Sequence, residues 1–145
     1  MNKYRTHTCE ELREKNVGNK VVLSGWINKK RDHGNLLFID LRDNYGVTQC
    51  IIDQENSKFS QLEKVQLETV IKIQGTVLKR SNETINKDID TGEIEVSIKS
   101  FEILGKCKEL PMPVFSDQEY SEEIRLKYRF LDLRRKKIHE NIILR

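Results

Sequence analysis

The strongest constraint on the fold of this chain is a series of short β-rich runs, separated by turns that contain Gly, Asn and Asp. In the runs at 36–42 and 47–53, successive side chains alternate as they do in a strand with one buried face. Three further runs, at 21–31, 68–80 and 93–104, are rich in apolar and β-branched residues. The sequence therefore predicts a mainly β domain with five strands.

Only short helices are predicted beside these strands. Residues 9–15 are a polar helix candidate at the N-terminus. Phe59, Leu62 and Val65 recur at a spacing of three, which favours a helix between the third and fourth strands. Gly25 indicates a sharp bend or a close backbone approach within the first strand. Together these features match the OB-fold, a partly open five-stranded Greek-key barrel, and we expect the chain to adopt it.

The strand pattern stops after Leu104. Residues 105–120 hold both prolines of the chain and predict an extended linker. Ser121 is placed to cap a helix, and the last residues begin another helix with an apolar face. We expect an OB-fold domain over 1–105, followed over 106–145 by a helical linker and the start of a further domain that this sequence does not include.

Composition excludes several classes of protein. The net charge of +3 is too small to indicate a polyanionic partner by itself. No run approaches the roughly 20 apolar residues that span a bilayer, and the start lacks the apolar centre of a signal peptide, so we expect a cytoplasmic protein with no membrane partner. Cys9, Cys50 and Cys107 have no metal-binding spacing, and we expect free thiols and no metal site.

The candidate binding surface is the face of the second and third strands, on which OB barrels bind single-stranded nucleic acid. Phe38 and Gln49 have the outward phase on these strands, and the basic residues 29–31 end the first strand. Two interpretations stay open for each: Phe38 stacks on a base or belongs to the core, and 29–31 contact phosphates or form a solvated turn.

Two other groups of polar residues are not assigned a catalytic role. We interpret Asp40, Arg42 and Asp43 as a structural network of ion pairs, because no metal ligand or nucleophile stands near them in sequence. The three histidines are scattered along the chain, so the sequence shows no catalytic triad, and we expect no catalytic residue here.

Several motifs together resemble one enzyme family. They are GWINKKRDHGNLLFIDLRDNYGVTQCIID at 25–53, GTVLKR at 75–80, TGEIEV at 91–96 and RLKYRFLDLRR at 125–135. This combination resembles the N-terminal, anticodon-binding domain of bacterial-type aspartyl-tRNA synthetases, and it covers nearly the whole chain. Lysyl and asparaginyl enzymes share the barrel, but the RDHG turn, DLRD and the loop ending in TGEIEV are closer to the aspartyl branch.

The resemblance implies roles for residues that contact the anticodon. Phe38 would stack on the middle base, a uridine, and Gln49 would hydrogen-bond to its edge. Arg31 would contact the third base. His33 stands where relatives carry His or Leu, and a histidine donates or accepts, so it would tolerate either C or U at that third position.

The first base and the adjacent backbone would be bound by Arg80, Asn86 and Glu95, again by resemblance. Two positions depart from the pattern. Ile51 replaces a common aromatic residue on the third strand, and Leu78 replaces a common arginine on the fourth. The resemblance therefore leaves base stacking at Ile51 and phosphate contact at Leu78 unsupported.

For the full-length enzyme the resemblance implies an aspartate-tRNA ligase of class II that uses ATP and Mg²⁺ and forms a homodimer. We expect no cofactor and no activity in this chain, whose end would fall where the catalytic domain starts. The tRNA partner would be aspartate tRNA, and also asparagine tRNA if recognition is relaxed.

Residues 125–137 either contact tRNA as a hinge or form a packing helix with a solvated face. Two competing functions remain: a general single-strand-binding OB protein and a protein-interaction barrel.

Overall fold

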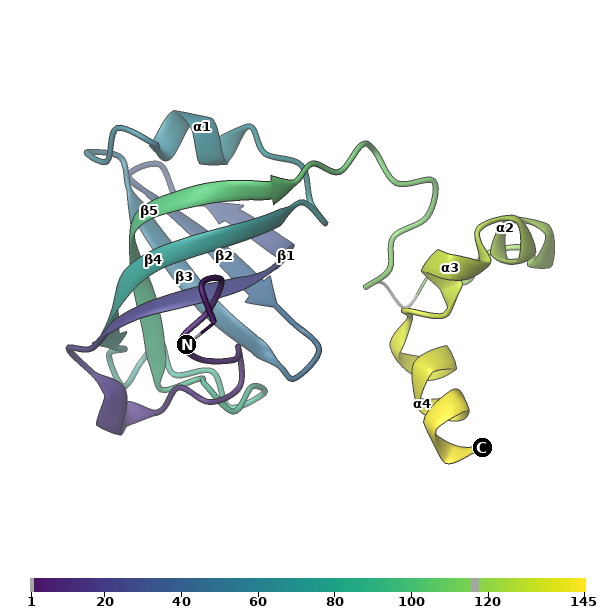
Figure 1. The fold of residues 1–145 in the computed structure, drawn as a ribbon, viewed down its shortest axis with the longest axis horizontal. Helices are drawn as coiled ribbons and strands as arrows, with labels where there is room; N and C mark the ends of the chain where they lie inside the picture. The colour runs from purple at the N-terminus through teal and green to yellow at the C-terminus, as the bar shows by residue number, and fades with distance from the viewer. Residues whose placement is uncertain (1, 116–117) are drawn as a thin grey trace. The chain divides into compact units, whose positions relative to one another are not determined.

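The computed structural model describes residues 2–115 and 118–145. The chain divides into two compact units, Met1–Lys108 and Glu109–Arg145. In the first unit a closed barrel has the strand order β1-β2-β3-β5-β4 (Figure 1). Its strands are β1 (Lys20–Asp32), β2 (Leu36–Arg42), β3 (Val47–Asp53), β4 (Val70–Lys79) and β5 (Ile94–Gly105). The predicted five-stranded barrel is confirmed.

The long first strand serves two neighbours. Its beginning pairs antiparallel with β4 and its end with β2, with a register irregularity between Ile27 and Lys29. Gly25 lies at the crossing, and a Cβ there would stand 2.2 Å from the carbonyl oxygen of Arg42. Only glycine permits this approach, which confirms the predicted role of Gly25. A short parallel pairing of β3 with β5 closes the barrel.

Alternation along the strands fills the barrel with apolar side chains. On β2, Leu37, Ile39 and Leu41 are at most 2% exposed, whereas Phe38 is half-buried and outside the core. On β3, Cys50 and Ile52 are buried in the same core. The predicted phases of both strands are therefore confirmed, and the intervening side chains form an outer face.

Helix α1 (Phe59–Glu63) joins β3 to β4 at one end of the barrel (Figure 1). Phe59, Leu62 and Val65 all belong to the barrel core, as their spacing predicts. Burial of Phe59 and Leu62 within the helix, and of Val65 just after it, anchors this short helix, which would not be stable alone.

The N-terminal helix expected over 9–15 is much shorter. Residues 9–11 form a turn, and a 3₁₀ helix, η1 (Glu14–Asn16), follows it. Asp43 accepts a hydrogen bond from the Cys9 N–H, and the Thr48 hydroxyl donates to the Cys9 carbonyl. These tertiary bonds use backbone groups that a helix would need, so the local helical preference is overridden.

The second unit is helical. It contains α2 (Glu122–Lys127), α3 (Arg129–Asp132) and α4 (Lys136–Leu144). Met112, Val114 and Leu131 form its small buried core. Ser121 stands at the N-cap of α2 as predicted, although its side chain makes no capping hydrogen bond.

None of the described helices is long and apolar enough to cross a membrane. Among residues 2–115 and 118–145 no group of three or more His, Cys, Asp or Glu side chains is arranged to hold a metal ion. Cys9 and Cys50 are buried free thiols, and Cys107 is partly exposed.

Candidate nucleic-acid interface

The outer face of β1, β2 and β3 brings together three of the predicted site residues, Arg31, Phe38 and Gln49, and their neighbours. Arg31 pairs in register with Phe38, which in turn pairs with Ile51. Two residues along β2, Asp40 pairs with Gln49. An aromatic ring therefore lies beside a group of polar side chains on one face, as the strand phases predict.

These polar side chains form a continuous chain of hydrogen bonds. The Arg31 Nη2 donates to Asp40 Oδ1 at 2.8 Å and to Gln49 Oε1 at 3.0 Å. At its other end, the Gln49 carboxamide donates from Nε2 to Glu95 Oε2 at 2.9 Å. This series of hydrogen bonds thus connects side chains of β2, β1, β3 and β5. We call Asp40, Arg31, Gln49 and Glu95 the outer-face network.

Arg80, directly after β4, supports the Glu95 end of this network. Its Nε donates to the Ile94 carbonyl at 2.9 Å and lies 3.9 Å from Glu95 Oε2. The side chain is only 3% exposed. Burial lowers the pKa of the Arg80 guanidinium, and the charge of Glu95 opposes that shift. Among the described residues, Arg80 Nη2 is buried and has no hydrogen-bond partner.

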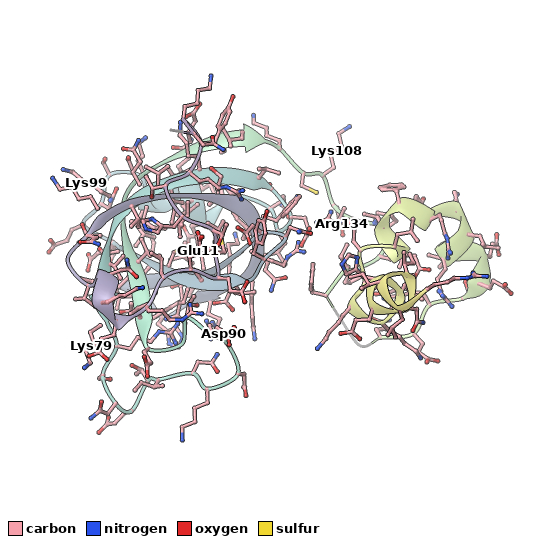
Figure 2. The ribbon with its side chains drawn as sticks, turned by 60° about the horizontal axis from the view of Figure 1, so that its bottom comes forward. Glu11, Lys79, Asp90, Lys99, Lys108 and Arg134 are labelled. Carbon is pink, nitrogen blue, oxygen red and sulfur yellow. The ribbon has the colours of Figure 1, made fainter. Side chains whose placement is uncertain are left out.

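Asn86 lies in the loop that joins β4 to β5, which runs between the labelled Lys79 and Asp90 in Figure 2. Its backbone N–H donates to the Gly92 carbonyl, and its side-chain oxygen accepts from the Asp88 N–H. None of the hydrogen bonds within the described residues joins Asn86 to the outer-face network. Asn86 therefore orders its own loop.

His33 lies in the exposed turn between β1 and β2 and touches the aromatic residue of the face. The rings of His33 and Phe38 meet edge to face, with centroids 5.1 Å apart and an interplanar angle of 80°. Gly34 has φ +78°, and its N–H bonds to Asp32 Oδ1, which fixes the turn. The alternation of side chains in the sequence does not predict this ring contact, because the contact depends on how the turn brings His33 toward β2.

The basic residues 29–31 do not act as one surface. Lys29 is exposed, whereas the Lys30 ammonium donates to the carbonyls of Glu63 and Val65 at the end of α1. Burial lowers the pKa of Lys30. Lys30 therefore has a structural role. It differs from Arg31 because successive residues of a strand point to opposite sides. Arg31 is the member of the triplet that joins the outer-face network.

Asp40, Arg42 and Asp43 form ion pairs as predicted, but not one network. The Arg42 guanidinium contacts both carboxylate oxygens of Glu68, at 3.1 and 3.0 Å. Asp43 lies 3.7 Å from Arg5. Asp40 belongs instead to the outer-face network, so it takes part in the candidate interface.

The two departures from the family pattern add apolar surface to the barrel exterior. Ile51 is half-buried and stands beside Phe38 in the register of β2 and β3. Leu78 is 39% exposed and pairs with Glu95 across β4 and β5. Neither side chain donates a hydrogen bond, so they contribute only shape and apolar contact.

Comparison with known families and sequences gives a consistent result. The model of the OB-fold nucleic acid binding domain named tRNA anti-codon matches residues 21–104. The aspartate–tRNA(Asp/Asn) ligase of Pelagibacter ubique is 78% identical over 145 residues, which are 100% of this chain and 24% of that protein. The ligase of the same name from Dinoroseobacter shibae is 59% identical over 100% of this chain and 25% of its own length. The chain therefore spans about a quarter of these relatives.

Solved structures show the same fold. The asparaginyl-tRNA synthetase from Pyrococcus horikoshii, complexed with asparaginyl-adenylate, is similar with a TM-score of 0.75 and 26% identity, over 90% of this chain and 29% of that one. An aspartyl tRNA synthetase from Entamoeba histolytica has a TM-score of 0.78 at 20% identity, over 90% of this chain and 32% of its own, and supports the fold alone.

Proposed function

Because this chain belongs to the tRNA anti-codon family of OB-fold nucleic acid binding domains, we propose that its barrel recognises the anticodon of aspartate tRNA. The observation that carries the proposal is the juxtaposition of the outward Phe38 with the outer-face network. An unstacked base offers a π-face and a polar edge, and this surface supplies a partner for each.

We assign the middle base, a uridine, to Phe38 and Gln49. Phe38 is half-buried on the outer face, so its ring has a fixed position from which to stack on a base. Gln49 stands two residues along the neighbouring strand from Ile51, the cross-strand partner of Phe38. This spacing suits one base that stacks on the ring and turns its edge toward the carboxamide.

The flanking bases are assigned to the two sides of the network. Arg31 has a side chain 40% exposed and is the donor proposed for the third base, next to His33 in the turn. Glu95 and the buried Arg80 are proposed to bind the first base, with Arg80 Nη2 as an uncommitted donor among the described residues. Asn86 is proposed to act on the adjacent backbone through the loop that it orders.

We further propose that the whole protein is an aspartate-tRNA ligase that acts on aspartate and asparagine tRNAs with ATP and Mg²⁺, as the names of its relatives suggest. It would be a cytoplasmic homodimer in which residues 1–105 recognise the anticodon. Residues 106–145 would link this domain to a class II catalytic domain. This chain by itself is expected to show no aspartate-dependent pyrophosphate exchange with ATP and Mg²⁺, and measurable exchange would contradict this division.

The test is a titration of this chain with the anticodon stem-loop of aspartate tRNA, with single changes at each anticodon base and a series of salt concentrations. We expect affinity that falls with salt and depends on anticodon sequence. Equal affinity for all sequences would indicate a general single-strand-binding protein. Absence of salt-dependent RNA binding would instead favour a protein-interaction barrel.

A further inference from the structure

The Gln49 carboxamide is held from both sides by groups of opposite character. Its Oε1 accepts from the Arg31 guanidinium at 3.0 Å, and its Nε2 donates to the Glu95 carboxylate at 2.9 Å. We propose that Arg31 and Glu95 are positioning residues that fix the orientation of this amide, so that it accepts uracil and rejects cytosine at the middle anticodon position. The inference rests on the proposed function.

The amide keeps hydrogen-bonding capacity for a base while it is held. A carboxamide oxygen has two lone pairs and its nitrogen has two N–H groups. In the hydrogen bonds made by the described residues, Arg31 uses one lone pair and Glu95 uses one N–H. One acceptor position and one donor position of Gln49 therefore remain for a base edge.

Rotation of the amide by half a turn would be unfavourable at both ends. The oxygen would then face the Glu95 carboxylate, and the N–H groups would face those of Arg31. Neither neighbour can change its character, because a carboxylate only accepts and a guanidinium only donates. The neighbours are themselves restrained: Asp40 holds Arg31 at 2.8 Å, and the buried Arg80 lies 3.9 Å from Glu95.

A fixed amide distinguishes the two pyrimidines, whereas a free one does not. Uracil presents an N–H at position 3 and a carbonyl at position 4, and cytosine presents an acceptor and an amino group at the same positions. A freely rotating glutamine would turn over and pair with either. With Gln49 fixed, cytosine pairs only if the base itself turns over, and stacking on Phe38 together with the ribose attachment opposes that.

The experiment compares two anticodon stem-loops that differ only in U or C at the middle position. We expect this chain to prefer U by about tenfold or more, as a bidentate contact does. Glu95→Gln replaces the obligate acceptor with a group of the same shape that donates or accepts, and we expect the preference to fall to about twofold. The matched control is Glu102→Gln on the same strand, whose carboxylate pairs with Lys72 away from the network, and it should keep the preference.

The opposite side of the amide provides an independent variant. Arg31→Met removes the donor and should also abolish the preference for U, whereas Arg31→Lys keeps a donor and should retain most of it. Hydrogen exchange of the Gln49 side-chain amide, measured by NMR without RNA, should become faster in Glu95→Gln. That measurement tests the restraint even if a variant binds RNA weakly.

The outcomes separate this inference from the proposed function. If the chain prefers U and both Glu95→Gln and Arg31→Met keep the full preference, Gln49 is not held in the way proposed. If Glu95→Gln weakens binding to both stem-loops equally, so that the ratio of the two affinities is unchanged, Glu95 contacts another base and does not orient Gln49. If the unmodified chain shows no preference for the middle base, the proposed function itself fails.

Discussion

Arginines meet carboxylates in both units of this protein, but the two arrangements differ in what they leave unused. In the helical unit, Asp132 is fully buried, and Arg125, Arg129 and Arg135 approach its oxygens at 3.2, 3.2 and 3.6 Å. In the outer-face network each side chain contacts only its neighbours along a line, and Arg31 is 40% exposed. The Asp132 carboxylate is 0% exposed and so offers no surface to a ligand, whereas the linear network keeps donors and acceptors for one. The difference separates a structural cluster from a recognition surface.

Removing the surrounded carboxylate should have the largest effect on stability. Asp132→Ala leaves three guanidinium groups close together without a counter-charge, and we expect the helical unit to lose roughly 3 kcal/mol. That is the low end for a broken buried pair, because the arginines partly contact water. Urea unfolding followed by the helical circular dichroism signal measures the loss. Stem-loop affinity should be unchanged.

The matched control is Glu140→Ala in the same unit. Glu140 lies 3.9 Å from Lys136 in an exposed pair, and such pairs contribute about 0 to 1 kcal/mol. If Asp132→Ala costs no more than Glu140→Ala, the Asp132 cluster does not stabilise the helical unit as the comparison requires.

Removing a member of the recognition surface should act on binding and leave folding intact. We expect Phe38→Ala and Gln49→Ala each to weaken stem-loop binding by about 1 to 3 kcal/mol, mainly through the middle base. Phe38 is half-buried and Gln49 is 8% exposed, but neither belongs to the apolar core of the barrel, so both variants should stay folded. Titration and thermal unfolding of the same samples measure the two effects.

Tyr45→Ala serves as the control for Phe38→Ala. Tyr45 is 54% exposed in the turn after β2 and contacts Arg5, away from the outer-face network. Its truncation should leave stem-loop affinity unchanged. A Phe38 or Gln49 variant that unfolds would show that the side chain supports the barrel and does not serve mainly as a contact for RNA.

The sequence could predict those features of the recognition surface that depend on a single strand, namely the face on which each side chain lies. Alternation along β2 and β3 assigned Leu37 to the core and Phe38 and Gln49 to the outer face. The structure confirms these faces, although Gln49 is only 8% exposed on the outer one. Resemblance then supplied roles for Arg80 and Glu95, which alternation alone would not have singled out.

Contacts between strands lay beyond prediction because they depend on register. The bond from Arg31 to Gln49 needs β1, β2 and β3 aligned to within one residue, since a slip of one would turn the side chains to the other face. For the same reason Asp40 was grouped with its sequence neighbour Arg42, although its partner is Arg31 across the strand. The capping of α1 by Lys30 joins residues more than thirty positions apart and leaves no local signal.

The smallest expected effect concerns the edge of the recognition surface, at His33. Its ring meets Phe38 edge to face at 5.1 Å, so it lies next to the proposed stacking surface without belonging to the network. An imidazole donates or accepts, and so it would tolerate either the amino group of C or the carbonyl of U at the third anticodon base. Leucine offers neither, and we expect His33→Leu to increase the preference for C by less than about tenfold, or about 1.4 kcal/mol.

Stem-loops that end in C or U measure this preference for the unmodified chain and for His33→Leu. His139→Leu, an exposed histidine of the helical unit, is the control and should leave the ratio unchanged. Aspartate and asparagine anticodons differ at this third base, so an unmodified chain that binds both within about tenfold would fit relaxed recognition. A larger preference for C in the unmodified chain would exclude relaxed recognition at the binding step. In that case discrimination at the third base would fall to Arg31, whose partly exposed side chain lies within the outer-face network, and His33 would be a solvated turn residue.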